Sequence, residues 1–453
     1  LRSVLWVLAV LASVVLVVYV SLGRLLSTNL QAYQTEVLAE LNARVPFEIE
    51  AGELSGEWHS FTPEIVLTDL RLRLPEGGGD TLELSGGRIG LDVLDSLATR
   101  SMQFTSVQLE SLELQGELTA DGRLVLPGLT GGGGAIGNWL REFLLNIEYV
   151  TLSQNTLYLS LPNGEQRQYE ADLHLAREGS ERALTVDLVS TGGARVHAVG
   201  RGVGNPFTPE QFVGNLYVRM DSSDLDAVRG MMAQEPAAWM TGALDTQWWL
   251  NWNRGALELD MQLQIEDALL KPSQGDWSVP LDRLSLAASL VEKRNRWTIY
   301  AADIVAQRGE ARVELPRLQL DLWGEALRLR ATQLQLEPLN ELILGLDTLP
   351  EAVQGVFEVL QPQGNVSALQ IAVSDVARPL DDWDVEANFD SVIVQSWKGA
   401  PGVTAANGYL EISQAGGHVV IDSQQFTMDF PVLYKQPLFY DDFFGTLIAR
   451  CGL

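Results

Sequence analysis

The stretch LELDMQLQIED, residues 257–267, alternates apolar and polar side chains through five cycles. Successive side chains of a β-strand point to opposite faces of the sheet, so this alternation predicts a strand with one dry face and one wet face. The apolar positions are Leu257, Leu259, Met261, Leu263 and Ile265. What covers them decides the architecture, because an ordinary domain places a helix or a second sheet over such a face.

The same alternation recurs through most of the 453 residues after position 47, whereas candidate helices are few. Two further segments show this alternation and are predicted to be strands. Their apolar positions are Leu318, Leu320 and Leu322 in one, and Leu369, Ile371 and Val373 in the other. The sequence therefore predicts a mainly β chain. Its excess of strand favours an elongated, curved antiparallel sheet with a few short helices over a compact domain.

Several patterns recur in the same order along the second half of the chain, at separations between 112 and 119 residues. The segment around Leu257 and Leu259 matches the segment around Leu369 and Ile371, for example. Repeats of this kind stack end to end, with faces that run on from one unit to the next. We expect one repeat unit at 221–335 and a second at 336–453, cut short at its carboxyl end, after an amino-terminal β section at 47–220.

Charge and cysteine content exclude several classes of protein. The net charge is −28 and no basic stretch interrupts it, which argues against nucleic acid as a partner. The single cysteine, Cys451, rules out a disulfide within the chain and a zinc site built from cysteines. The four histidines are far apart in the sequence, without the close spacing of a metal site, so we expect no catalytic residues, no metal and no cofactor.

The first residues predict a membrane anchor. Residues 4–23 carry no charge, and about 20 apolar residues are enough to cross a bilayer as a helix. Trp6 and Tyr19 lie toward the ends of this segment, where interfacial aromatic residues are favoured, and Val15 lies between them. We expect a transmembrane signal anchor at 1–26 rather than a cleaved signal peptide, followed by an amphipathic helix at 27–46 that caps the sheet.

Two groups of segments resemble a known family. The anchor and the amphipathic helix are followed by NARVPFEIEAGELSGEW and PEIVLTDLRLRL, and the later WKGAPGVTAANGYLEI and DFPVLYKQPL complete the pattern. Its recognisable positions are Trp397, Gly399, Pro401, Gly408 and Pro431. These segments resemble the AsmA-like proteins, and more closely the YhdP branch of this family in Gram-negative bacteria. Family members are longer than this chain.

The resemblance implies a non-enzymatic, bridge-like lipid transfer protein. Such a protein is anchored in the inner membrane by a single pass and projects a β-sheet groove into the periplasm. It carries phospholipid toward the outer membrane, which supports the outer-membrane barrier. The partners that the resemblance implies are phospholipid acyl chains, the inner membrane, and inner- and outer-membrane proteins. The eleven alternating positions named above then line the groove. The alternative is an envelope scaffold or outer-membrane assembly factor, with a closed β core and no lipid conduit.

Overall fold

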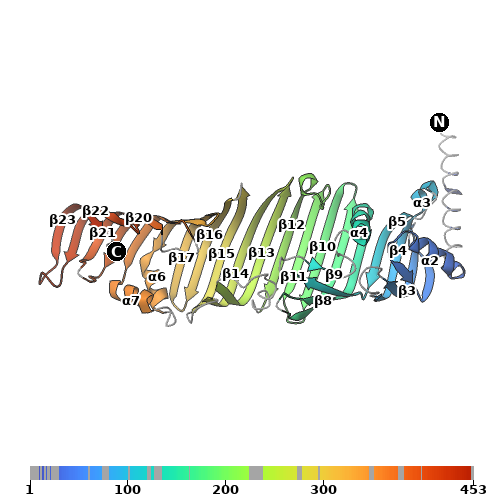
Figure 1. Cartoon of the computed structure of the whole chain (residues 1–453), viewed down its shortest axis with the longest axis horizontal. Helices are drawn as coiled ribbons and strands as arrows, with labels where there is room; N and C mark the ends of the chain where they lie inside the picture. Colours follow the sequence, from blue (N-terminus) through green and yellow to red (C-terminus); the bar gives the residue numbers. More distant parts are fainter. Residues whose placement is uncertain are drawn as a thin grey trace, which may run out of the picture. The chain divides into compact units, whose positions relative to one another are not determined.

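The computed structural model of the chain is mainly β, with antiparallel strands and a few short helices. It describes residues 10, 13, 14, 17, 21, 30–59, 62–73, 81–99, 103–119, 124–126, 135–162, 164–223, 238–272, 278–293, 296–345, 351–375, 382–398 and 400–449. The chain divides into two units, and the division falls within strand β12 (Val213–Ser222). The first unit holds the residues up to Val218, and the second holds most of the chain from Arg219 onward (Figure 1).

The helical elements of the first unit are η1 (Leu30–Tyr33), α2 (Gln34–Asn42), α3 (Val93–Thr99), α4 (Ala135–Asn146) and η2 (Pro209–Gln211). Its strands before β12 are β1 (Glu48–Glu50), β2 (Glu53–His59), β3 (Thr62–Arg73), β4 (Thr81–Asp92), β5 (Gln103–Glu110), β6 (Glu113–Leu118), β7 (Leu124–Val125), β8 (Tyr149–Ser160), β9 (Gln166–Glu178), β10 (Glu181–Ser190) and β11 (Arg195–Val203).

Helix α2 packs on the first strands of this unit. Its Val37 and Leu41 are 6% and 2% exposed, and they join a core with Leu54, Ile65 and Leu67 of β2 and β3. The spacing of these two helix residues, four apart, places both on one face of the helix. An amphipathic helix was expected in this region, and the structure places it against the apolar side of β1–β3.

One connection in the first unit departs from the expected antiparallel pattern. Strand β8 runs parallel to both β5 and β6, with Ser106 opposite Tyr149 and Glu113 opposite Thr156. A parallel pair needs a crossover connection, and helix α4 lies within the segment that joins β6 to β8. The buried Asn155 secures the break between the two short strands, because its Oδ1 accepts a hydrogen bond from the backbone N–H of Leu112.

The described strands of the second unit, apart from the part of β12, are β13 (Ala238–Asn253), β14 (Ala256–Pro272), β15 (Val279–Lys293), β16 (Arg296–Arg308), β17 (Ala311–Trp323), β18 (Ala326–Gln335), β19 (Gln363–Val373), β20 (Trp383–Val394), β21 (Gly402–Ser413), β22 (Gly416–Asp429) and β23 (Leu438–Ala449). Helices α6 (Leu336–Leu344) and α7 (Glu351–Leu360) lie between β18 and β19. From β14 to β23 each strand pairs antiparallel with the next one in the sequence (Figure 1).

The prediction of a mainly β, antiparallel chain with few short helices is thus confirmed. The repeat units at 221–335 and 336–453 stay a prediction. Within the described part of the chain, no helix is long and apolar enough to cross a membrane. Most of the predicted anchor, including Trp6, Val15 and Tyr19, lies outside the described residues.

Candidate functional site

A row of large apolar side chains crosses eight neighbouring strands of the second unit. Strand registers place its members directly opposite one another from β14 to β21. We call it the leucine row, and it comprises Leu259, Leu290, Ile299, Leu320, Leu329, Ile371, Val385 and Ile412. With seven inter-strand steps of about 4.8 Å, the row is roughly 34 Å long. All eight side chains are half-buried rather than enclosed.

Two further rows lie beside it on the same face, because residues two apart in a strand share a face. The first, the alanine row, comprises Met261, Ala288, Ala301, Leu318, Ala331 and Leu369. The second, the outer row, comprises Trp297, Leu322, Leu327, Val373 and Trp383. Since the three rows carry no charged side chain, together they form a continuous apolar surface, which we call the apolar face.

Helix α6 covers one edge of the apolar face. Its buried Leu342 packs in a cluster with Ile265 of β14, Leu281 of β15 and Val313 of β17. Ile265 is 4% exposed there, whereas Leu257 at the opposite end of the same strand is 42% exposed. The apolar face therefore has a helix-covered edge, beside the ends of β14, β16 and β18, and an opposite edge marked by the start of each of these strands.

The structure brings the predicted lining residues together. Of the eleven, Leu259, Leu320 and Ile371 fall in the leucine row, Met261, Leu318 and Leu369 in the alanine row, and Leu322 and Val373 in the outer row. Leu257, Leu263 and Ile265 continue the same alternation along β14. The sequence prediction did not include the other five members of the leucine row, which are Leu290, Ile299, Leu329, Val385 and Ile412. The period-2 alternation of LRLRATQLQ in β18 was a usable signal for Leu329.

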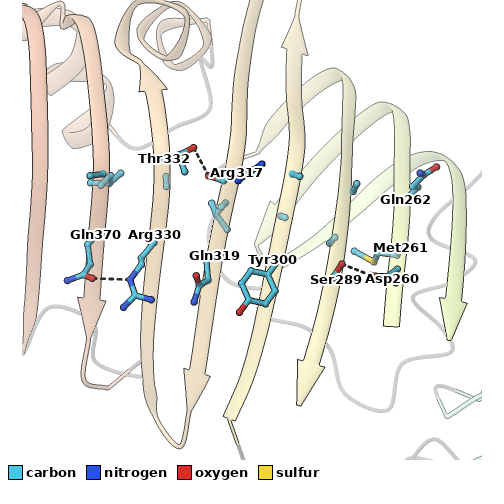
Figure 2. A pocket seen from close by; sticks show the side chains of 18 of the residues that line it. Asp260, Met261, Gln262, Ser289, Tyr300, Arg317, Gln319, Arg330, Thr332 and Gln370 are labelled. Atoms are coloured by element: carbon cyan, nitrogen blue, oxygen red, sulfur yellow. Dashed lines mark hydrogen bonds between the residues drawn. The ribbon is translucent and has the colours of Figure 1, made fainter. Parts of the chain in front are cut away.

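The opposite face of the same sheet, the polar face, carries the side chains that alternate with the three rows. A cavity of about 1000 Å³ is lined by residues of both faces, including all six members of the alanine row. Most of its lining comes from residues that alternate with the alanine row and so point the other way. They include Asp260, Ser289, Tyr300, Gln319 and Arg330. Figure 2 shows the hydrogen bonds that Arg330 donates to Gln370 and that Ser289 donates to Asp260. The cavity therefore follows the alanine row across the sheet, and no member of the leucine row lines it.

Asp321 is the most buried carboxylate described on this polar face, with 1% of its surface exposed. It accepts hydrogen bonds from Thr298 Oγ1 at 2.8 Å and from Gln319 Nε2 at 2.9 Å. Arg296 Nη2 lies 2.9 Å and Arg330 Nη1 3.2 Å from its Oδ2. Burial acts to raise the pKa of Asp321, but the hydrogen bonds from Thr298 and Arg296 and the charge of Arg296 outweigh it and hold this pKa below its usual value.

No group of three or more histidine, cysteine, aspartate or glutamate side chains in the described residues is arranged to hold a metal ion. In the predicted anchor, the described residues are helical, and Val10, Val14 and Val17 are 55%, 55% and 63% exposed.

Comparison with known proteins gives a consistent answer. The family model described as YhdP protein matches residues 1–449. The intermembrane phospholipid transporter YhdP of Escherichia coli strain K12 is 22% identical over 440 residues, which is 92% of this chain and 33% of that protein. The chain thus spans about a third of the length of this relative. No solved structure gives a significant match. With a family match over nearly its whole length, the chain belongs to the YhdP family.

Proposed function

We propose that this chain is part of a non-enzymatic transporter that moves phospholipid between the inner and outer membranes, with acyl chains lying along the apolar face. The observation that carries the proposal is the leucine row, whose eight side chains stay half-buried across eight paired strands. A relative that transports phospholipid between membranes supports it.

Acyl chains suit the apolar face because they remove its exposed surface from water. Each methylene that is buried contributes about 0.8 kcal/mol, without any directional bond. The leucine row has a member on each of eight strands, and the alanine and outer rows have members on six and five of these strands. An acyl chain that slides by one strand along them exchanges one set of apolar contacts for another. A surface of this kind holds lipid without fixing it at one place. It also gives no direction of transport, which must come from a gradient or a partner.

The same proposal assigns a location to the anchor and to the strands. Residues 1–26 are the single-pass anchor in the inner membrane, and the strands lie in the periplasm, where they form a groove and serve the outer-membrane barrier. The described part of the anchor supports this, because Val10, Val14 and Val17 are exposed at helical positions four and three apart. Exposed valines in this arrangement give a helix an apolar side for contact with lipid.

The test places charge on the apolar face. We expect the double variant Leu259→Asp with Met261→Asp to fold and to lose most of the phospholipid that co-purifies with the wild-type chain, as measured by mass spectrometry. The matched control, Gln262→Asp with Thr332→Asp, adds two carboxylates at exposed positions of the polar face and keeps its lipid. A well-folded wild-type chain without bound lipid would refute the proposal and favour the scaffold alternative.

A further inference from the structure

The edge of the apolar face away from helix α6 has its own chemistry. Here β16 begins with Arg296 and Trp297, β17 ends with Leu322 and Trp323, and β20 begins with Trp383. Trp297, 41% exposed, belongs to the apolar face, and Trp323, 36% exposed, points to the opposite side of the sheet. Tryptophan is favoured where an apolar surface meets a polar one, because its ring is apolar and its N–H is polar.

Two arginines flank Trp323 at this edge. The guanidinium of Arg296 lies 5.2 Å from the ring centre, and that of Arg328 lies 5.6 Å from it. Arg330, two residues after Arg328 in β18, joins these residues through its ion pair with Asp321. We call Arg296, Asp321, Trp323, Arg328 and Arg330 the Trp323 cluster.

The cluster carries three positive charges and one negative charge, in a chain whose net charge is −28. Asp321 accepts bonds from Arg296 and Arg330. Arg328 makes no ion pair within the described residues, and its Nε is buried there without a hydrogen-bond partner. Asp321 lies directly opposite Arg328 in the register of β17 and β18, and the next acidic residue along this row, Asp384, is two strands from Arg328 on the other side, at about 10 Å. The three arginines of the cluster thus share one carboxylate, which leaves the cluster with a net charge of +2 and with the Nε of Arg328 unpaired.

We propose, building on the function proposed above, that the Trp323 cluster binds the anionic phosphate group of a phospholipid whose acyl chains lie on the apolar face. Arginine is well matched to phosphate, because its planar fork donates two parallel hydrogen bonds. Stacking on Trp323 holds Arg296 and Arg328 in place. The outer row, with Trp297 and Leu322, begins one residue from the cluster, so a headgroup at this edge is joined to tails on the apolar face.

The experiment compares lipids with and without a phosphate. Its probes are phosphatidylglycerol and a diacylglycerol with the same acyl chains, and binding is titrated for the wild type, Arg328→Gln and Arg328→Lys. We expect Arg328→Gln to weaken phosphatidylglycerol binding by roughly tenfold to a hundredfold, as for the loss of hydrogen bonds to a charged group, and to leave diacylglycerol binding unchanged. Arg328→Lys restores part of the loss because it keeps the charge.

The control is Arg312→Gln, which removes an exposed arginine paired with Glu314 and leaves both bindings unchanged. Circular dichroism and thermal unfolding establish that each variant is folded. If Arg328→Gln binds each of the two lipids as tightly as the wild type does, the headgroup site is overturned, whereas the proposal that acyl chains lie on the apolar face is unaffected. A wild type that binds neither lipid overturns the proposed function itself. Glycerol phosphate that binds the cluster as tightly as the lipid shows a site for soluble phosphates and overturns the assignment to a lipid headgroup.

Discussion

Replacing Leu320 by aspartate places one carboxylate in the middle of the leucine row, between Ile299 and Leu329. If an acyl chain lies on this row, it must cover the new carboxylate. Covering a charge in an apolar contact is so unfavourable that the group takes up a proton instead. The cost of binding is then close to the cost of protonation. With an ordinary pKa near 3.9, protonation costs about 4 kcal/mol at pH 7 and about 1.5 kcal/mol at pH 5.

Leu320→Asp is therefore expected to bind a fluorescent phospholipid about a thousandfold more weakly than wild type at pH 7, with affinity rising close to tenfold for each unit of pH down to about 4. Titration of the lipid into the purified variant at several pH values measures both quantities. Leu320→Asn, which has a similar shape but no carboxyl group, loses affinity without this slope. Thr332→Asp, on the exposed polar face, binds lipid as wild type does.

The reasoning is refuted by either of two results. The first is a Leu320→Asp variant that binds lipid as tightly as wild type at pH 7, since no acyl chain then covers the row. The second is a loss of binding that does not change with pH, since the loss then comes from disturbed folding rather than from a buried charge.

Three further predictions concern stability. The pKa of Asp321 in the folded chain lies below its usual value, so its ionised carboxylate stabilises the fold above the unfolded-state pKa. This contribution is lost as the pH falls through the folded-state pKa. The unfolding free energy of Asp321→Asn, measured by urea unfolding at several pH values, should therefore fall less steeply below about pH 4 than that of the wild type. Phe426 is 0% exposed, and Phe426→Ala should cost about 3–5 kcal/mol in the same measurement; a cost under 1 kcal/mol would place this side chain outside the core. Gly408→Ala should destabilise by about 1–3 kcal/mol, because a Cβ there would overlap the carbonyl oxygen of Val420, and an unchanged melting temperature would contradict that close approach.

The alternation of residues 257–265 was enough to predict strand β14 and its apolar face, because one period-2 pattern fixes both. It could not predict which residues of the neighbouring strands lie opposite these positions. The pairing of β15 with β16 shifts between Ser285 and Ala287, and Asp303 in this part of β16 has a positive φ of 51°. A bulge of this kind moves later side chains to the other face, and its position depends on tertiary contacts rather than on local composition.

The polar side of the sheet was less predictable. Arg328 and Arg330 alternate with leucines, which marks them as outward-facing but does not reveal Asp321 as their common neighbour. Their association depends on the register of β16, β17 and β18, which joins residues up to 34 positions apart. The parallel pairing of β8 with β5 and β6 was likewise not predicted, because period-2 alternation marks a strand but not the direction of the strand it pairs with.

The most direct test of the central claim is photo-crosslinking at single positions of the two faces. A photoreactive amino acid at Leu329, in the leucine row, is expected to give a phospholipid adduct in cells that make the full protein, detected by mass spectrometry of the purified chain. The same amino acid at Thr332, three residues along β18 and exposed on the polar face, should give none. Adducts of equal yield at both positions, or no adduct at Leu329, would contradict the account.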